Sequence, residues 1–192
     1  MNPIEGRVTT PKATLRRAAL ALSASVLLAG GPAEAGDVWL GVGVGQVKPE
    51  GVKATVAFSG ELRLELGKHF ALQPDVGTWK KTESIAGVSG SLSDFSFGAT
   101  ALVLLPLRPV RIYAGAGPSV HHVSGDLASY GLTLASDSVT RVGITSLAGL
   151  DIEISRRVAF FFAGRYEWVT LETSDPDNIN QRILYGGFRL RL

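Results

Sequence analysis

Apolar and polar residues alternate with a period of two through most of this chain, and this pattern constrains its fold most. In residues 93–105, for example, Phe95, Phe97 and Val103 fall on one side of an extended chain and Asp94 on the other. Successive side chains of a β-strand point to opposite faces, so the pattern predicts strands with one apolar and one polar face. We expect a strand in each of eight such segments: 37–47, 54–66, 70–80, 93–105, 110–123, 139–154, 158–171 and 182–192.

The connections between these segments fall into two classes by length. Three are short, at 67–69, 106–109 and 155–157. Four are longer and polar, at 46–53, 81–92, 124–138 and 172–181. In an up-and-down sheet all the short turns lie at one end and all the long loops at the other. The sequence therefore predicts an all-β fold, an eight-stranded antiparallel up-and-down barrel.

The apolar faces indicate what surrounds this barrel. Hydrocarbon offers backbone N–H and C=O groups no partner, so only helices and closed sheets cross a bilayer. Strands of about 9–11 residues suffice for the crossing. We therefore expect a transmembrane barrel with apolar faces toward lipid and charged faces inward. Alternation alone also permits the opposite arrangement, a soluble lipocalin-like barrel with an apolar, ligand-binding interior.

The N-terminus has the features of an export signal. A positive region that includes Arg17 precedes an apolar run at 18–29, and small residues follow up to Ala35. The apolar run is too short to span a hydrocarbon layer of roughly 30 Å as a helix. We expect a secretory signal peptide at residues 1–35, cleaved after Ala35, and an outer-membrane β-barrel domain at 36–192.

Charge and cysteine content exclude several functions. Without residues 1–35 the chain loses four of its 19 basic and two of its 17 acidic residues, which leaves 15 of each. A neutral mature chain has no basic surplus, so we expect no nucleic-acid partner. Cysteine is absent, which excludes disulfides, thiolate zinc sites and a thiol nucleophile. No cofactor and no metal site are expected.

The last strand has a role of its own. In the final stretch, GGFRLRL, the side chains of Phe188, Leu190 and Leu192 fall on one face, and those of Arg189 and Arg191 on the other. We expect this strand to pair with the first strand, so that the sheet closes and no edge remains.

Three phrases carry a resemblance to a known family: LQPDVGTW at 72–79, RIYAGAGPSV at 111–120 and SLAGLDIEISRRVAFFFAGRYEWV at 146–169. They resemble the small OmpA-like and OmpX-like outer-membrane β-barrel domains of Gram-negative bacteria. The resemblance implies a cell-envelope location in the bacterial outer membrane, with both termini in the periplasm. It also implies that Gly187, Leu190 and Leu192 form the C-terminal assembly signal of such barrels.

The resemblance also implies the partners of the chain. These are the lipid bilayer with its lipopolysaccharide and the barrel-insertion machinery, with further surface partners bound through the loops. It implies a monomer.

Near the predicted outer end we expect part of an aromatic girdle, from Trp79, Phe95, Tyr166 and Trp168.

The polar faces predict a charged interior. A barrel of eight strands is just wide enough for its own side chains to fill it. We expect a lumen ion-pair network formed by Glu61, Arg63, Glu65, Asp75, Arg111, Arg141, Asp151, Glu153, Arg165, Glu167 and Arg189. Asp94 and Arg191 face the same way and would also contribute to this network. The near balance of opposite charges favours a plug. A polar path for small ions is the alternative.

One pair of residues raises the question of catalysis. By parity His122 and Ser124 face outward near the loop end, and they resemble the His-x-Ser pair of lipid A deacylase barrels. A serine nucleophile needs an adjacent base held by a third group, and no carboxylate is evident for that role. Gly125 also replaces the asparagine that follows the serine in that family. We therefore expect no catalytic residues and no enzyme activity.

The pattern as a whole favours an integral outer-membrane barrel without enzymatic activity. Its role would be structural or surface-interacting through its extracellular loops, with the lumen plugged by ion pairs. Two alternatives stay open: an esterase that modifies lipid A, and the soluble lipocalin-like barrel.

Overall fold

The computed structural model describes residues 36–85, 88–129, 132–170 and 180–192. The expected signal peptide, residues 1–35, lies outside the described residues. The described ranges contain eight strands: β1 (Val38–Pro49), β2 (Thr55–Glu65), β3 (Phe70–Ile85), β4 (Val88–Leu107), β5 (Val110–Ser129), β6 (Leu132–Glu153), β7 (Val158–Thr170) and β8 (Gln181–Arg191). Within these ranges, no helix is long and apolar enough to cross a bilayer.

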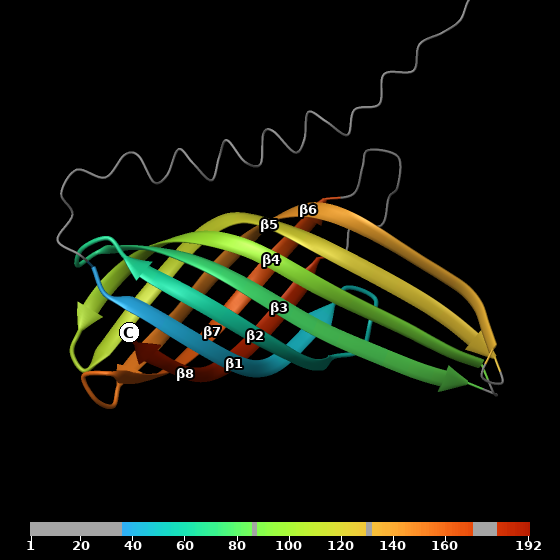
Figure 1. Cartoon of the computed structure of the whole chain (residues 1–192), viewed down its shortest axis with the longest axis horizontal. Coiled ribbons are helices and arrows are strands. Elements are labelled where there is room, and N and C mark those ends of the chain that lie inside the picture. The colour runs from blue at the N-terminus through green and yellow to red at the C-terminus, as the bar shows by residue number, and fades with distance from the viewer. Residues whose placement is uncertain (1–35, 86–87, 130–131, 171–179) are drawn as a thin grey trace, which may run out of the picture. The chain divides into compact units, whose positions relative to one another are not determined.

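The strands form a closed barrel in chain order (Figure 1). Each strand pairs antiparallel with the next, and β8 returns to pair with β1 from Trp39↔Arg191 to Pro49↔Gln181. The predicted eight-stranded up-and-down barrel is therefore confirmed, as is closure by the last strand. No strand of the barrel wall is left with an open edge at this seam.

Side chains follow the predicted faces. Outward positions carry exposed apolar residues, such as Val42 at 64% and Ile144 at 60% exposed. Inward positions carry charged residues that are almost fully buried, such as Arg63 and Arg189 at 1% each. The lipocalin-like alternative required an apolar interior and a charged exterior, so it is wrong.

The main departure from prediction concerns four strands. The predicted loops 81–92 and 124–138 are mostly strand, because β3–β6 run on as two long hairpins at the right of Figure 1. β4, β5 and β6 have 20, 20 and 22 residues, whereas β1 has 12 and β8 has 11. These stretches are rich in Ser, Thr and Gly and lack apolar alternation, so their strand signal is weak. Pairing with the neighbouring strand supplies the backbone hydrogen bonds instead.

We call the protruding part the extension and define it as residues 80–85, 88–93, 124–129 and 132–141. Its two outer strands lack partners in the described ranges on one side. The β2–β3 ladder ends at Ala57↔Trp79, and the β6–β7 ladder begins at Val142↔Thr170. Within the extension one register shift occurs, between Leu127 and Ala128. Among the described residues, the extension is thus a four-stranded sheet whose two outer strands, β3 and β6, have no further partner.

Glycine is required where β1 and β8 meet, at Gly45 on β1 and at Gly187 on β8. A Cβ atom added at Gly187 would run into the carbonyl oxygen of Val42 and the Cα of Gly43 on β1. The side chain of any other residue would therefore push the closing strand away from its partner. By contrast, a Cβ atom at Gly164 on β7 would make only an ordinary contact of 3.4 Å with Leu184.

This difference predicts the outcome of a matched pair of substitutions. Gly187→Ala should weaken closure of the barrel, because backbone atoms of β1 must shift to admit the methyl group. Gly164→Ala should leave the barrel intact. Heat-dependent migration in SDS gels measures the fraction of folded barrel, and equal folding of the two variants would contradict the account of the seam.

Candidate functional site: the charged interior of the barrel

The half of the barrel nearest the short turns holds a compact set of ion pairs, the turn-end cluster of Glu61, Arg63, Gln73, Asp151 and Arg189. Arg63 Nη1 lies 2.6 Å from Asp151 Oδ2. Its Nε and Nη2 atoms donate to Gln73 Oε1 at 3.0 and 2.9 Å. Arg189 contacts both carboxylates, Glu61 and Asp151. Two guanidinium groups and two carboxylates thus balance in charge.

Aromatic rings complete this cluster. Tyr113 lies beside both guanidinium groups, with its ring centroid 4.1 Å from Arg63 Cζ and 5.0 Å from Arg189 Cζ. Arg189 Nη2 donates to the Tyr113 hydroxyl at 3.1 Å, and the Phe161 ring lies 4.2 Å from Arg189 Cζ. Cation–π contact compensates part of the hydration that a buried guanidinium loses. The rings also occupy space beside the ion pairs.

The half nearest the extension holds a second set, the extension-end cluster of Asp75, Asp94, His121, Arg165, Glu167 and Gln181. Arg165 Nη1 lies 2.6 Å from Asp75 Oδ1 and 3.4 Å from Glu167 Oε1. Gln181 Nε2 donates to Glu167 Oε2 at 2.6 Å and to Asp94 Oδ2 at 3.0 Å.

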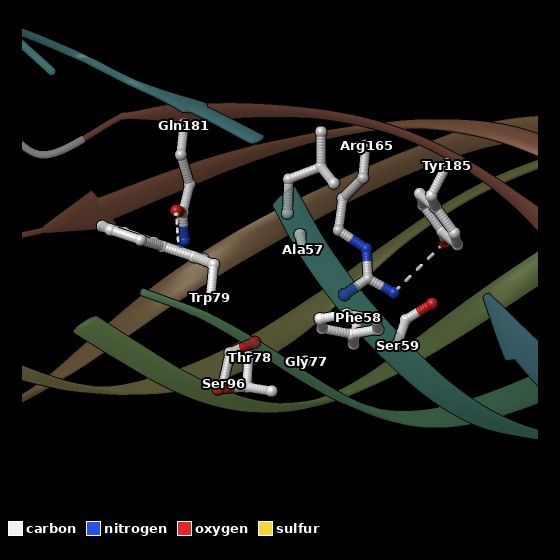
Figure 2. Close-up of a pocket in the computed structure, with 11 residues that line it drawn as sticks. Ala57, Phe58, Ser59, Gly77, Thr78, Trp79, Ser96, Arg165, Gln181 and Tyr185 are labelled. Atoms are coloured by element: carbon white, nitrogen blue, oxygen red, sulfur yellow. Dashed lines mark hydrogen bonds between the residues drawn. The ribbon is translucent and has the colours of Figure 1, made fainter. Parts of the chain in front are cut away.

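Further contacts extend this cluster across the barrel. His121 Nδ1 is 2.9 Å from Asp94 Oδ2, and the indole N–H of Trp79 donates to Gln181 Oε1 at 3.0 Å. Figure 2 shows Trp79 and Gln181 on one side of Arg165 and Tyr185 on the other. A cavity of about 20 Å³ between them is lined in part by Ser59, Ser96 and Arg165. This volume holds roughly one water molecule.

At the short-turn end, charged residues form a rim. Arg111 contacts Glu65 and lies 3.0 Å from Glu153, and Arg191 contacts Asp37. Side chains of the rim are partly exposed, so removing one partner of these pairs should cost less stability than removing one partner of a fully buried pair.

Arg141 differs from the other predicted network residues. Its side chain is half-buried, and it forms no ion pair within the described ranges. Its Nε and Nη1 atoms are buried without a hydrogen-bond partner there. Arg141 lies one residue beyond the last described β6–β7 pair, Val142↔Thr170, where the wall of the barrel gives way to the extension.

Sequence reasoning missed the neutral and aromatic members of the two clusters. Gln73, Gln181, Tyr113 and Tyr185 all lie inward and contact an arginine or a carboxylate. Parity could have placed each of them in the lumen, but a search for opposite charges overlooks them. Trp79 was predicted to lie in the outer girdle. It is buried instead, because it shares the inward face of β3 with Gln73 and Asp75.

The pair considered for catalysis lies on the outer surface without a nucleophile–base contact. His122 Nδ1 is 3.1 Å from the Thr140 hydroxyl, and Ser124 accepts a hydrogen bond at its carbonyl from Ser93. No hydrogen bond joins His122 to Ser124 in this part of the structure. Nor do the described ranges contain a group of His, Asp and Glu side chains arranged to hold a metal ion.

The sequence profile of one family, the outer membrane protein beta-barrel domain, matches residues 18–191. The chain belongs to this family. It is therefore a β-barrel of the bacterial outer membrane, and its exposed apolar faces meet lipid. No curated protein sequence matches this outer-membrane barrel significantly.

Solved structures agree with the fold. Neisserial surface protein A is 18% identical, covering 81% of this chain and 97% of that protein, with a TM-score of 0.65. A major outer membrane protein from Thermus thermophilus is 12% identical over 83% and 100%, with a TM-score of 0.62. The attachment invasion locus protein of Yersinia pestis, Ail, is 16% identical over 80% and 96%, with a TM-score of 0.52. At these identities the likeness concerns the fold alone.

The buried pairs predict unequal effects of arginine removal. Arg165→Ala would leave Asp75 and Glu167 in the interior without their nearest cation, which costs about 3–5 kcal/mol of the free energy of unfolding. Lys68→Ala, in an exposed turn, should change it by less than about 0.5 kcal/mol. Urea unfolding of the purified barrel in detergent measures both values.

A second substitution tests whether the unpaired charge of Asp75 causes this loss of stability. Adding Asp75→Asn to Arg165→Ala should recover part of the loss, because one unpaired buried charge is removed. A double variant no more stable than the single one would mean that the charge of Asp75 is not what Arg165 balances.

Proposed function

We propose that this outer-membrane barrel is a non-enzymatic surface protein whose extension binds extracellular polypeptides while its lumen stays closed. In this proposal the extension lies outside the cell and both termini lie in the periplasm. The observation that carries it is the four-stranded extension, whose outer strands have no further partner in the ranges that the structure describes. A barrel that served only to seal or brace the membrane would not need strands of 20 and 22 residues.

The two clusters support a closed lumen. Charged, amide and aromatic side chains contact one another across the barrel at two levels, and the cavity of about 20 Å³ between Ser59, Ser96 and Arg165 has room for roughly one water molecule. An ion that crossed would have to displace Arg165 and Arg189 from their carboxylates. Each displacement would leave buried charges unpaired.

A closed lumen predicts that the barrel conducts no ions across a membrane. The barrel reconstituted in a planar bilayer should produce no conductance steps above the empty bilayer at moderate voltage. An open porin inserted in the same bilayer serves as the positive control. Reproducible ion currents from the folded barrel would support the polar path for small ions instead.

The outer strands of the extension favour a polypeptide partner. An unpaired strand edge presents N–H and C=O groups that an extended peptide can match by adding a strand. The β6 edge, residues 132–141, is the longer of the two, and side chains 135–140 are exposed.

The charge of the extension argues against a polyanionic partner. The structure of Ail was solved in complex with the heparin analogue sucrose octasulfate. In this chain, however, the extension as defined carries three basic and three acidic residues, among them Lys80, Lys81, Glu83 and Asp137. A balanced surface has little attraction for a sulfated glycan.

The proposed orientation can be tested by labelling, because the natural chain contains no cysteine. Ser136→Cys, in the extension, should react with a membrane-impermeant maleimide on intact cells. Lys68→Cys, in a short turn, should react only after the outer membrane is broken. Labelling of Lys68→Cys on intact cells would place the short turns outside and contradict the orientation.

Trimming the extension tests the binding role. The pairs Lys81↔Leu92 and Ser124↔Ser138 allow both hairpins to be cut at matched positions, with an Asn-Gly turn joining each pair. The trimmed barrel should still fold, as judged by heat-dependent gel migration. Cells that display it should lose adhesion to immobilised unfolded polypeptide. Equal adhesion by full-length and trimmed barrels would contradict the proposal, and strong retention on heparin would favour a glycan partner.

A further inference from the structure

Two cations face outward side by side where β1 and β8 leave the apolar belt. Lys48 on β1 is the direct cross-strand partner of Arg182 on β8, and Arg182 in turn is the partner of Tyr166 on β7. The side chains of Lys48 and Arg182 are exposed, and they share their faces with the exposed residues Val44 and Leu184. The row Lys48, Arg182 and Tyr166 therefore lies on the lipid-facing side of the wall.

The height of this row corresponds to the border of the membrane. Below it, the outward face of β8 is apolar at Leu184, Phe188 and Leu190. From Leu190 to Arg182 the chain advances roughly 26 Å at about 3.3 Å per residue. With the usual strand tilt this is about 20 Å of height, near the roughly 25 Å of an outer-membrane apolar band. The cations thus lie at the level of the lipid headgroups.

Aromatic side chains hold the arginine in this row. Arg182 Cζ is 5.8 Å from the Tyr166 ring centroid. The Tyr166 ring in turn packs edge-on against Trp168, with centroids 4.5 Å apart. Tyr and Trp are enriched at this level of membrane proteins because their rings are amphipathic. The Tyr166 ring thus lies beside the Arg182 guanidinium at this level of the barrel.

The row also borders a cavity large enough for a headgroup. A cavity of about 560 Å³ is lined by residues that include Lys48, Lys53, Tyr166, Arg182, Asn180 and Glu50. Asn180 Nδ2 donates to the Glu50 carboxylate at 3.2 Å. In the part of the chain that the structure describes, neither Lys48 nor Arg182 has a carboxylate within ion-pair distance. Among the described residues, the positive charge of this pair is therefore not balanced by an ion pair.

We infer that Lys48 and Arg182 bind one phosphate group of lipid A, with the acyl chains of that lipid along the apolar faces of β1 and β8. Directly opposite residues of antiparallel strands have Cβ atoms about 4.5–5.5 Å apart, so both side chains reach a single phosphate. Arginine contacts phosphate through two parallel N–H groups, and lysine adds a point charge. The lipid A assignment rests on the proposed orientation, because lipid A occupies the outer leaflet.

The test measures binding of bisphosphorylated lipid A to the folded chain in detergent by native mass spectrometry. The double variant Lys48→Gln/Arg182→Gln should bind roughly 30-fold more weakly, which follows from the usual contribution of two basic residues near anionic lipid. Lys80→Gln removes another exposed lysine of the same end, and its affinity should stay within about twofold of the unsubstituted chain. Arg182→Lys keeps the charge and should retain most of the binding.

Two further lipids test whether the phosphates and the additional acyl chains of lipid A are both recognised. Lipid A without its phosphates should bind the unsubstituted chain as weakly as bisphosphorylated lipid A binds the double variant. Phosphatidylglycerol, which also carries a phosphate, should bind less tightly than bisphosphorylated lipid A, because it lacks the additional acyl chains along β1 and β8.

Three results would overturn the inference: equal affinity of the double variant and Lys80→Gln, equal binding of dephosphorylated lipid A, or equal binding of phosphatidylglycerol. Heat-dependent gel migration verifies that each variant is folded. Binding in detergent does not depend on which end of the barrel is outside. The maleimide experiment therefore reports failure of the proposed orientation separately from failure of this site.

Discussion

Backbone hydrogen bonding within hydrocarbon is the constraint on which the rest of this structure depends. Each strand in lipid must find partners for its N–H and C=O groups inside the protein, since no water is available. The eight ladders meet this requirement only because β8 pairs with β1 over eleven residue pairs. Closure then divides every strand into an outward and an inward face. Lipid selects apolar side chains for the outward face, and the side chains of the inward face must fill the narrow lumen.

The polar interior is the consequence of that division. Eight strands enclose too little space for a wide water channel, so inward side chains must satisfy one another. Arg63 and Arg189 with their carboxylates do so at one level, and Arg165 with Asp75 and Glu167 does so at the other. Removing one partner of a buried pair is costly even where forming the pair contributes little net stability. The interior pairs therefore connect strands that lie on opposite sides of the wall, such as β2 and β6 through Arg63 and Asp151.

The sequence predicted the wall well and the ends poorly. Residues such as Phe95 and Asp94 reveal their faces because lipid and lumen impose opposite chemistry on neighbouring positions. Beyond the membrane both faces of a strand meet water, so the Ser-rich and Gly-rich extension shows no such contrast and was predicted as loops. Charge alone predicted the arginines and carboxylates of the interior. It could not predict Gln181, which joins its neighbour Glu167 on β7 to Asp94 on β4 across the barrel.

The most direct test of the account measures the surroundings of two neighbouring positions on β6. A nitroxide attached at Ile144→Cys should collide freely with oxygen dissolved in the bilayer, because this position faces lipid and its natural side chain is 60% exposed. A nitroxide at Thr145→Cys should be immobilised and shielded, because the natural side chain is 2% exposed within the lumen. Electron paramagnetic resonance of the reconstituted barrel reports both. A shielded label at position 144 with an oxygen-accessible one at 145 would contradict the orientation of every strand described above.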